Sequence, residues 1–245
     1  MHPTRHFLPC LVAALLLTGA PAALAGDGPA AATSADTTSM PPHDLRLATP
    51  VRGDAHAGSG KTEVCAACHG KDGMATSPIF PSLAGQSATY LYLQLRAFKD
   101  GWRHNDSMQP MVAPLSDRDM RDIAAWYASL PRKAAPHDTN DNDSRGATLY
   151  HRGDASRGIP GCQGCHGADG AGPRPDPDSS APQPAWATFP ALAGQPSAYV
   201  LAQLQAYRDG SRSGSTNTRV MHGVSAGLDD ADMQALADYI AAMQP

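Results

Sequence analysis

Apolar residues recur every three or four positions in two separate stretches of the chain, 87–100 and 197–209. That spacing places them on one face of a helix. Gly101 and Gly210 follow the two stretches, and glycine commonly ends a helix. The pattern therefore predicts two amphipathic helices. Their apolar positions are Tyr90, Leu91, Leu95 and Phe98 in the first, and Val200, Leu201, Leu204 and Tyr207 in the second.

In two further stretches, residues that favour a helix N-terminus are followed along the chain by an apolar stripe. One opens with Ser116 and Asp119, the other with Asp229 and Asp232. No alternation of apolar and polar residues is long enough for a strand, so the sequence predicts an all-α fold. The stripes are expected to pack in the core, their two methionines included. They consist of Met120, Ile123, Ala124 and Tyr127, and of Met233, Leu236, Ala237 and Ile240.

These helices belong to a tandem duplication. The string P-x-L-A-G-Q occurs at 81–86 and again 109 residues later. The helices predicted to begin at Ser116 and Asp229, called the closing helices below, are related by an offset of 113. The shared blocks predict two small domains, here called the first repeat (53–130) and the second repeat (144–245), joined by a linker at 131–143. The second copy also carries extra residues within 171–188, where Pro, Asp and Ser predict a surface loop.

The composition limits what can fill such small domains. Hydrophobic residues make up 42% of the 245 residues and aromatic residues 6%, beside 23 glycines and 22 prolines. Something other than aliphatic side chains is therefore expected in the interior. The formal charge is −4, and no basic run occurs, which argues against binding of nucleic acid.

The beginning of the chain has the pattern of an export signal. Basic residues precede an apolar run at 7–20, and Ala23-Leu24-Ala25 supplies a small-x-small cleavage pattern. We expect cleavage after Ala25, with an uncleaved anchor as the alternative. No other stretch is long enough to span a bilayer, so the mature chain is expected to lack a transmembrane segment. Residues 26–52, poor in large apolar side chains, are expected to be a tail without a fold.

Four of the cysteines occur in two copies of one string, C-x-x-C-H. The first copy is Cys65, Cys68 and His69, and the second, 97 residues later, is Cys162, Cys165 and His166. In such a string two thiols can add to the vinyl groups of a haem while the histidine ligates its iron. Two intervening residues put both thiols on one helical face. The duplicated string therefore predicts two covalently attached c-type haems.

Other uses of four cysteines fit the spacing less well. Two disulfides are the ordinary alternative in an exported protein. A thioredoxin-like redox pair is disfavoured because no βαβ pattern surrounds either string. A four-cysteine zinc site would need the two pairs close together, whereas 97 residues separate them.

The second axial ligand of each iron has candidates in the segment before the closing helix. Met108 precedes Leu115 by seven residues, and Met221 precedes Leu228 by the same interval. We therefore predict Met108 and Met221 as the shared ligands, in loops between helices, with Met111 as the rival in the first repeat. An axial histidine also needs a fixed acceptor for its other ring nitrogen. The carbonyl groups of the repeated Pro81 and Pro190 are predicted to serve.

Taken together, the two C-x-x-C-H-G-x-D-G strings, the two P-x-L-A-G-Q strings and the methionines before each closing helix resemble the dihaem cytochrome c4 family over about 53–243. The resemblance implies two cytochrome c-like domains related by a pseudo-twofold axis, with His69 and Met108 on one iron and His166 and Met221 on the other. It implies a periplasmic electron carrier, not an enzyme, whose partners are a respiratory donor and a terminal oxidase or reductase. The alternatives are a haem subunit of a dehydrogenase complex, or a dihaem enzyme such as a peroxidase or thiosulfate dehydrogenase.

Overall fold

The computed structural model describes residues 43–46, 48–132, 144–173 and 184–244, all within the unit formed by 39–245. The predictions for the signal peptide, for the tail as far as residue 42, for the linker from 133 and for 174–183 lie outside these residues. The helices are α1 (Ala55–Ser59), α2 (Glu63–His69), α3 (Ala88–Lys99), α4 (Met108–Val112), α5 (Asp117–Ser129), α6 (Arg145–Arg152), α7 (Gln163–His166), α8 (Ser197–Arg208), α9 (Thr216–Ser225) and α10 (Asp230–Ala242), with short 3-10 turns at Ala155–Arg157 and Ala185–Thr188.

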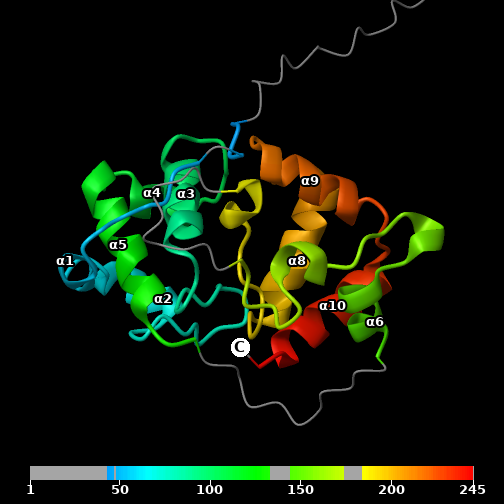
Figure 1. The fold of residues 1–245 in the computed structure, drawn as a ribbon. Helices are drawn as coiled ribbons and strands as arrows, with labels where there is room; N and C mark the ends of the chain where they lie inside the picture. Colours follow the sequence, from blue (N-terminus) through cyan, green and yellow to red (C-terminus); the bar gives the residue numbers. More distant parts are fainter. Residues whose placement is uncertain (1–42, 47, 133–143, 174–183, 245) are drawn as a thin grey trace, which may run out of the picture. The chain divides into compact units, whose positions relative to one another are not determined.

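Both repeats have the same helix packing. In the first, α5 packs against α1 and α3, and in the second, α10 packs against α6 and α8 (Figure 1). Within the described ranges only isolated β-bridges occur and no strand, so the prediction of an all-α fold is confirmed. None of the helices in these ranges combines the length and the apolar character that crossing a membrane requires.

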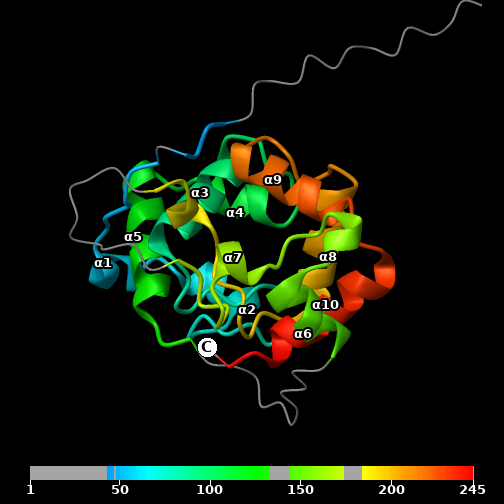
Figure 2. The same ribbon diagram turned by 45° about the vertical axis from the view of Figure 1, so that its right-hand side comes forward.

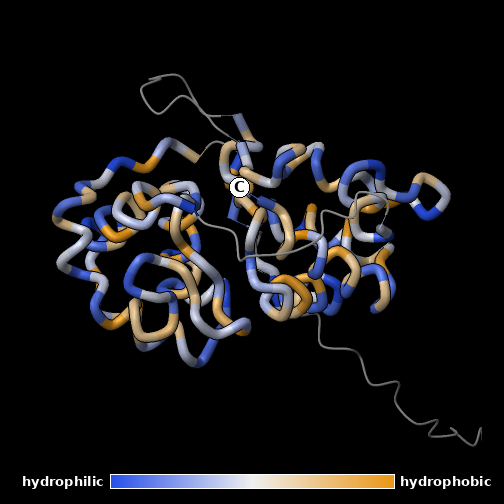
Figure 3. Tube along the Cα trace, turned by 90° about the horizontal axis from the view of Figure 1, so that it is seen from below, coloured by the Kyte–Doolittle hydropathy of each residue, from blue (hydrophilic) through white to orange (hydrophobic). Residues whose placement is uncertain are grey.

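The closing helices supply much of the core of each repeat, as their stripes predict. Met120 and Met233 are 2% and 0% exposed, so both pack in the interior. Figure 3 shows hydrophobic and hydrophilic positions mixed along the helices, which is the pattern of amphipathic elements. The buried stripes hold α5 against α3 and α10 against α8 by the hydrophobic effect.

Glycines let the first helix of each repeat approach the closing helix closely. A Cβ atom built on Gly58 of α1 would lie 2.0 Å from the backbone oxygen of Asp122 in α5. A Cβ atom on Gly146 of α6 would lie 2.2 Å from the backbone oxygen of Ala235 in α10. Neither distance is compatible with a side chain, so the two helix crossings depend on glycine.

The closing helices begin with reciprocal capping boxes. In α5 the hydroxyl of Ser116 accepts from the backbone N–H of Asp119, whose carboxylate accepts from Ser116 in return, and Asp229 and Asp232 repeat the arrangement in α10. This confirms the helix starts predicted from these residues. Asp232 is also 3% exposed, and it accepts hydrogen bonds from the guanidinium groups of Arg145 and Arg157 at 2.8 and 2.7 Å.

Replacing Asp232 with asparagine is expected to lower the free energy of unfolding by about 2 kcal/mol at pH 7, because a buried ion pair loses its anion. Burial raises the pKa of Asp232, but hydrogen bonds from Arg145 and Arg157 outweigh it and lower the pKa below its usual value. The stabilisation is therefore complete above the unfolded pKa of about 3.9 and is lost as the pH falls through the lower folded value.

Urea unfolding between pH 7 and pH 3 measures this effect. The difference between the parent and the Asp232→Asn variant should shrink as the pH falls below 4. Asp230→Asn is the control, because Asp230 lies in the same helix and pairs with Arg208 while its side chain is 79% exposed. An equal loss in both variants, or a difference that does not depend on pH, would contradict the expectation.

Two segments differ from what the sequence predicts. Within the stretch 26–52, expected to lack a fold, His43 forms a β-bridge with Ser215, and Leu45 is buried. Burial of Leu45 and the backbone pairing of His43 hold this part of the segment at the start of α9, which composition alone does not reveal. The methionine regions, predicted as loops, form the helices α4 and α9. Asn105 accepts from the backbone N–H of Met108, and a capping box at Ser215 starts α9.

Candidate haem sites

Each C-x-x-C-H string lies on a short helix that ends at its histidine. The first is α2, ending at His69, and in the second string α7 ends at His166. Gly70 and Gly167 follow with φ angles of 79° and 84°, a conformation that reverses the chain and favours glycine. The four cysteines of the strings are free thiols rather than disulfides, so all four are available to bond to haem.

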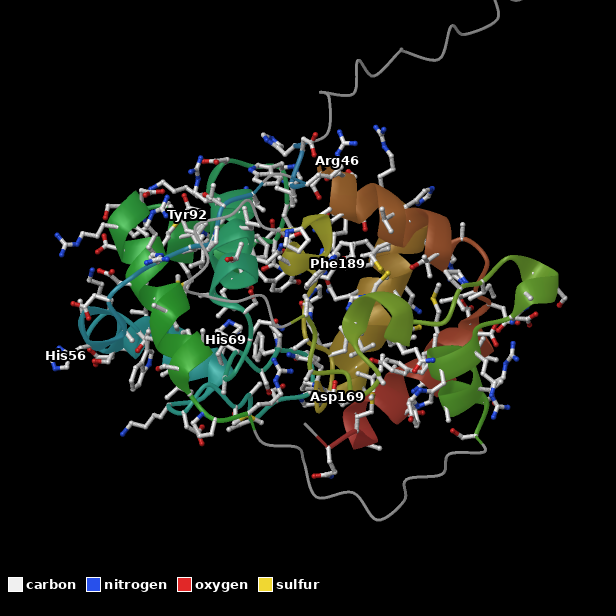
Figure 4. The ribbon with its side chains drawn as sticks, viewed as in Figure 1. Arg46, His56, His69, Tyr92, Asp169 and Phe189 are labelled. Atoms are coloured by element: carbon white, nitrogen blue, oxygen red, sulfur yellow. The ribbon has the colours of Figure 1, made fainter. Side chains whose placement is uncertain are left out.

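The two histidines are buried and have the same hydrogen bond. Nδ1 of His69 lies 2.9 Å from the carbonyl oxygen of Pro81, and Nδ1 of His166 lies 2.9 Å from that of Pro190. The predicted acceptors are thus confirmed. Because a carbonyl oxygen only accepts, each Nδ1 carries the proton and each Nε2 presents a lone pair. Burial lowers the pKa of both rings despite this bond, which favours the neutral form that binds iron. Figure 4 shows His69 turned inward and His56 turned outward.

Two of the four thiol groups lack the lowered pKa of a catalytic cysteine. Burial raises the pKa of the Cys162 thiol to about 11, and burial also raises the pKa of Cys65. Reactive cysteines have a lowered pKa, because the thiolate is the nucleophile. The described residues also contain no group of three His, Cys, Asp or Glu side chains that could hold a metal ion. Both observations favour haem attachment over disulfide exchange and over a zinc site.

The candidate methionine ligands lie on the two helices that precede the closing helices. Met108 is the first residue of α4, which packs against α3, and Met221 lies within α9, which packs against α8 (Figure 2). Met111, the rival to Met108, is on the same short helix and its residue is 43% exposed. The assignment of Met108 as ligand stays a prediction.

In the second repeat, the histidine and the methionine meet at one hollow. His166 and Met221 both line it, together with Cys165, Phe189 and Tyr207. The hollow opens to solvent, and its cavity volume is about 50 Å³. Its wall thus combines a thiol, an imidazole, a thioether and aromatic rings. That donor set fits a c-type haem, whose iron His166 and Met221 would bind.

A polar network missed by the sequence reasoning lies beside this hollow and joins the two repeats. Arg212 donates to Gln203 of its own repeat at 2.7 Å and to Tyr90 and Gln94 of the first repeat at 3.0 and 2.9 Å. Arg103 is its counterpart in the first repeat. It donates to Gln94 at 2.5 Å, and to Gln203 and Tyr199 of the second repeat at 2.9 and 3.4 Å.

The members of this network pair up at the offset of 109 residues that relates the two P-x-L-A-G-Q strings. Arg103 corresponds to Arg212, and Gln94 corresponds to Gln203. This common spacing identifies the four residues as repeated positions, but the contacts between them are visible only in the structure.

The chemistry of Arg212 supports the fit of haem at the hollow. Arg212 is 7% exposed, and its hydrogen-bond acceptors among the described residues are neutral. Its Nε has no hydrogen-bond partner among those residues. A buried cation is ordinarily paired with an anion, and Arg212 also lines the hollow. A haem carries carboxylates, whose negative charge would pair with this guanidinium.

Comparisons with known proteins identify the family of this chain. The Cytochrome c family matches residues 57–131 and 144–244. Cytochrome c4 of Pseudomonas aeruginosa is 39% identical over 188 residues, which cover 77% of this chain and 88% of that protein. The thiosulfate dehydrogenase electron acceptor of Thiomonas intermedia is 40% identical over 181 residues, which cover 73% and 77%. The crystal structure of reduced recombinant cytochrome c4 from Pseudomonas stutzeri matches with a TM-score of 0.70 and 38% identity, covering 78% of this chain and 100% of that one.

Proposed function

Because this chain belongs to the dihaem cytochrome c4 family of electron-transfer proteins, we propose that it carries single electrons in the periplasm, from a respiratory donor to a terminal oxidase or reductase. When bound, each of its two c-type haems supplies an iron that alternates between the ferrous and ferric states. The proposal excludes a substrate bound at either iron. The observation that carries it is the presence of His166 and Met221 in the wall of one hollow.

The residues of the chain have distinct parts in this function. In each repeat the two cysteines, Cys65 and Cys68 or Cys162 and Cys165, hold the haem covalently. His69 and His166 bind iron through Nε2, because Pro81 and Pro190 hold their Nδ1 atoms.

Met108 and Met221 would each supply a thioether to the iron, which would favour the ferrous state relative to a second histidine. A site with both axial positions occupied by the protein leaves no position for a substrate. Two fixed protein ligands would keep the ligand geometry similar in both oxidation states, which favours fast electron transfer.

A narrower version of the proposal names the donor. The relative from Thiomonas intermedia is described as an electron acceptor of thiosulfate dehydrogenase, at 40% identity. That description favours a dehydrogenase as the donor to this chain as well, with the chain as acceptor rather than as the enzyme. Mixing the oxidised protein with thiosulfate should leave it oxidised, and adding a thiosulfate dehydrogenase should then reduce it. Turnover of thiosulfate by the purified chain alone would support the enzyme alternative instead.

Absorption spectroscopy of the protein matured in a host that assembles c-type cytochromes tests the proposal directly. We expect two covalent haems per chain by pyridine haemochrome, the near-red band of methionine-ligated ferric haem, and no change when carbon monoxide is added to the reduced protein. A response to carbon monoxide would show an accessible iron and would contradict the carrier function at that site.

A further inference from the structure

Two buried glutamines bridge the repeats in a reciprocal manner. Gln86 and Gln195 end the two P-x-L-A-G-Q strings, and each is 4% exposed. Gln195 accepts from the backbone N–H of Ser82 at 3.0 Å and donates to its carbonyl oxygen at 2.7 Å. Gln86 does the same with Ala191, at 2.9 Å for both bonds. Each side-chain amide therefore satisfies both backbone groups of one residue in the opposite repeat.

These contacts reach the peptide groups that hold the axial histidines. The N–H of Ser82 and the carbonyl of Pro81 belong to one planar peptide unit, and that carbonyl accepts from His69. A continuous chain of hydrogen bonds therefore runs from Gln195 through this peptide unit to His69. In the other direction, Gln86 reaches His166 through the peptide unit shared by Pro190 and Ala191.

We propose that Gln86 and Gln195 are positioning residues, each of which tunes the axial histidine of the opposite repeat. A hydrogen bond to the N–H of a peptide group polarises its carbonyl, because neighbouring bonds in a chain strengthen one another. The carbonyl then accepts more strongly from Nδ1–H, which makes the imidazole a better donor to iron. Better donation stabilises the ferric state. The inference rests on the proposed function, since it assigns His69 and His166 to iron.

Each glutamine is expected to change the reduction potential of the haem in the opposite repeat. Removing the amide of Gln195, in the second repeat, weakens the bond at His69 and favours the ferrous state of the first haem. At a fixed ambient potential we expect its ferrous-to-ferric ratio to rise about threefold, or about 28 mV at 59 mV per tenfold change. Removing the amide of Gln86 has the same effect on the haem at His166.

Gln195→Met and Gln86→Met test this, because methionine has a similar length and no amide. In the ferrous protein, the NMR signal of the Nδ1 proton of His69 should move upfield in Gln195→Met and stay in place in Gln86→Met, with the reverse for His166. Redox titration should show one potential raised in each variant. Gln234→Met is the surface control, since Gln234 is exposed and donates to Asp238 of its own helix.

A conservative variant separates tuning from packing. In Gln195→Glu, a protonated carboxyl group reproduces both bonds to Ser82 and an ionised one accepts more strongly, so the first potential should not rise. If the glutamines only held the repeats together, both histidine signals would move in either variant, or neither would move while the melting temperature fell. Either result overturns the inference. Failure of the proposed function shows itself separately, as carbon monoxide binding by the unaltered protein.

Discussion

A Met108→Ala variant is expected to bind carbon monoxide at one of its two reduced haems, and the reduction potential of that haem should fall. Alanine has no donor atom, so the iron held by His69 would lose its thioether ligand, which favours the ferrous state. The expected fall is about 0.2 V, a quarter of the about 0.8 V that axial ligands span. Redox titration and carbon monoxide difference spectra measure both effects.

Met111→Ala is the matched control for this experiment. Met111 lies on the same short helix as Met108, three residues further on, and is 43% exposed. Its removal should leave the potential and the carbon monoxide response unchanged. If Met111→Ala opens the iron and Met108→Ala does not, the ligand assignment in the first repeat is wrong. Met221→Ala should reproduce the Met108→Ala result at the second haem.

Gly58→Ala is expected to lower the free energy of unfolding by about 3 kcal/mol, the upper part of the usual range for overpacking. The added methyl group would lie 2.0 Å from the backbone oxygen of Asp122. A side chain could relieve such a clash by changing rotamer, but a backbone atom cannot. Helices α1 and α5 would have to separate along their contact. For a protein of this size the melting temperature should fall by about 6–12 °C.

Gly60→Ala provides the comparison. Gly60 lies two residues away with φ at −75°, which alanine adopts freely, and the nearest atom to its added Cβ is 4.0 Å away. Its effect should stay within about 1 kcal/mol. Calorimetry of the two variants with both haems attached measures the difference. Equal melting temperatures would show that the α1–α5 crossing does not depend on a glycine at position 58.

Periodic elements were the part of the fold that the sequence predicts well. The stretches 87–100 and 197–209 became α3 and α8, with ends within one residue of those expected, because their apolar positions have helical spacing and glycines follow them. The short helix α1 has no such stripe, and α6 spans only eight residues, although Ala147, Leu149 and Tyr150 on it are buried. Their place depends on Gly58 and Gly146, and a glycine within a helix is by itself a sign of weak helix formation, not of a crossing.

The sequence likewise predicts only some of the residues of the site. The sequence alone identifies the histidines and the prolines that orient them, because those residues belong to contiguous strings that occur twice. Arg212 and Gln195 belong to the same repeats, yet Tyr90 and Gln94, which accept from Arg212, and Ser82, which pairs with Gln195, lie in the opposite copy. A contact between copies leaves no local pattern, so only the three-dimensional structure shows that Gln195 meets Ser82.

The reciprocal contacts of the two glutamines have an evolutionary consequence. Ser82 and Ala191 are buried, and their backbone groups have partners in the other half of the chain. A descendant that lost either copy would leave the survivor with a backbone segment, next to its axial histidine, deprived of those partners. The two copies are therefore interdependent halves, because each glutamine satisfies backbone groups beside the haem-binding histidine string of the other copy.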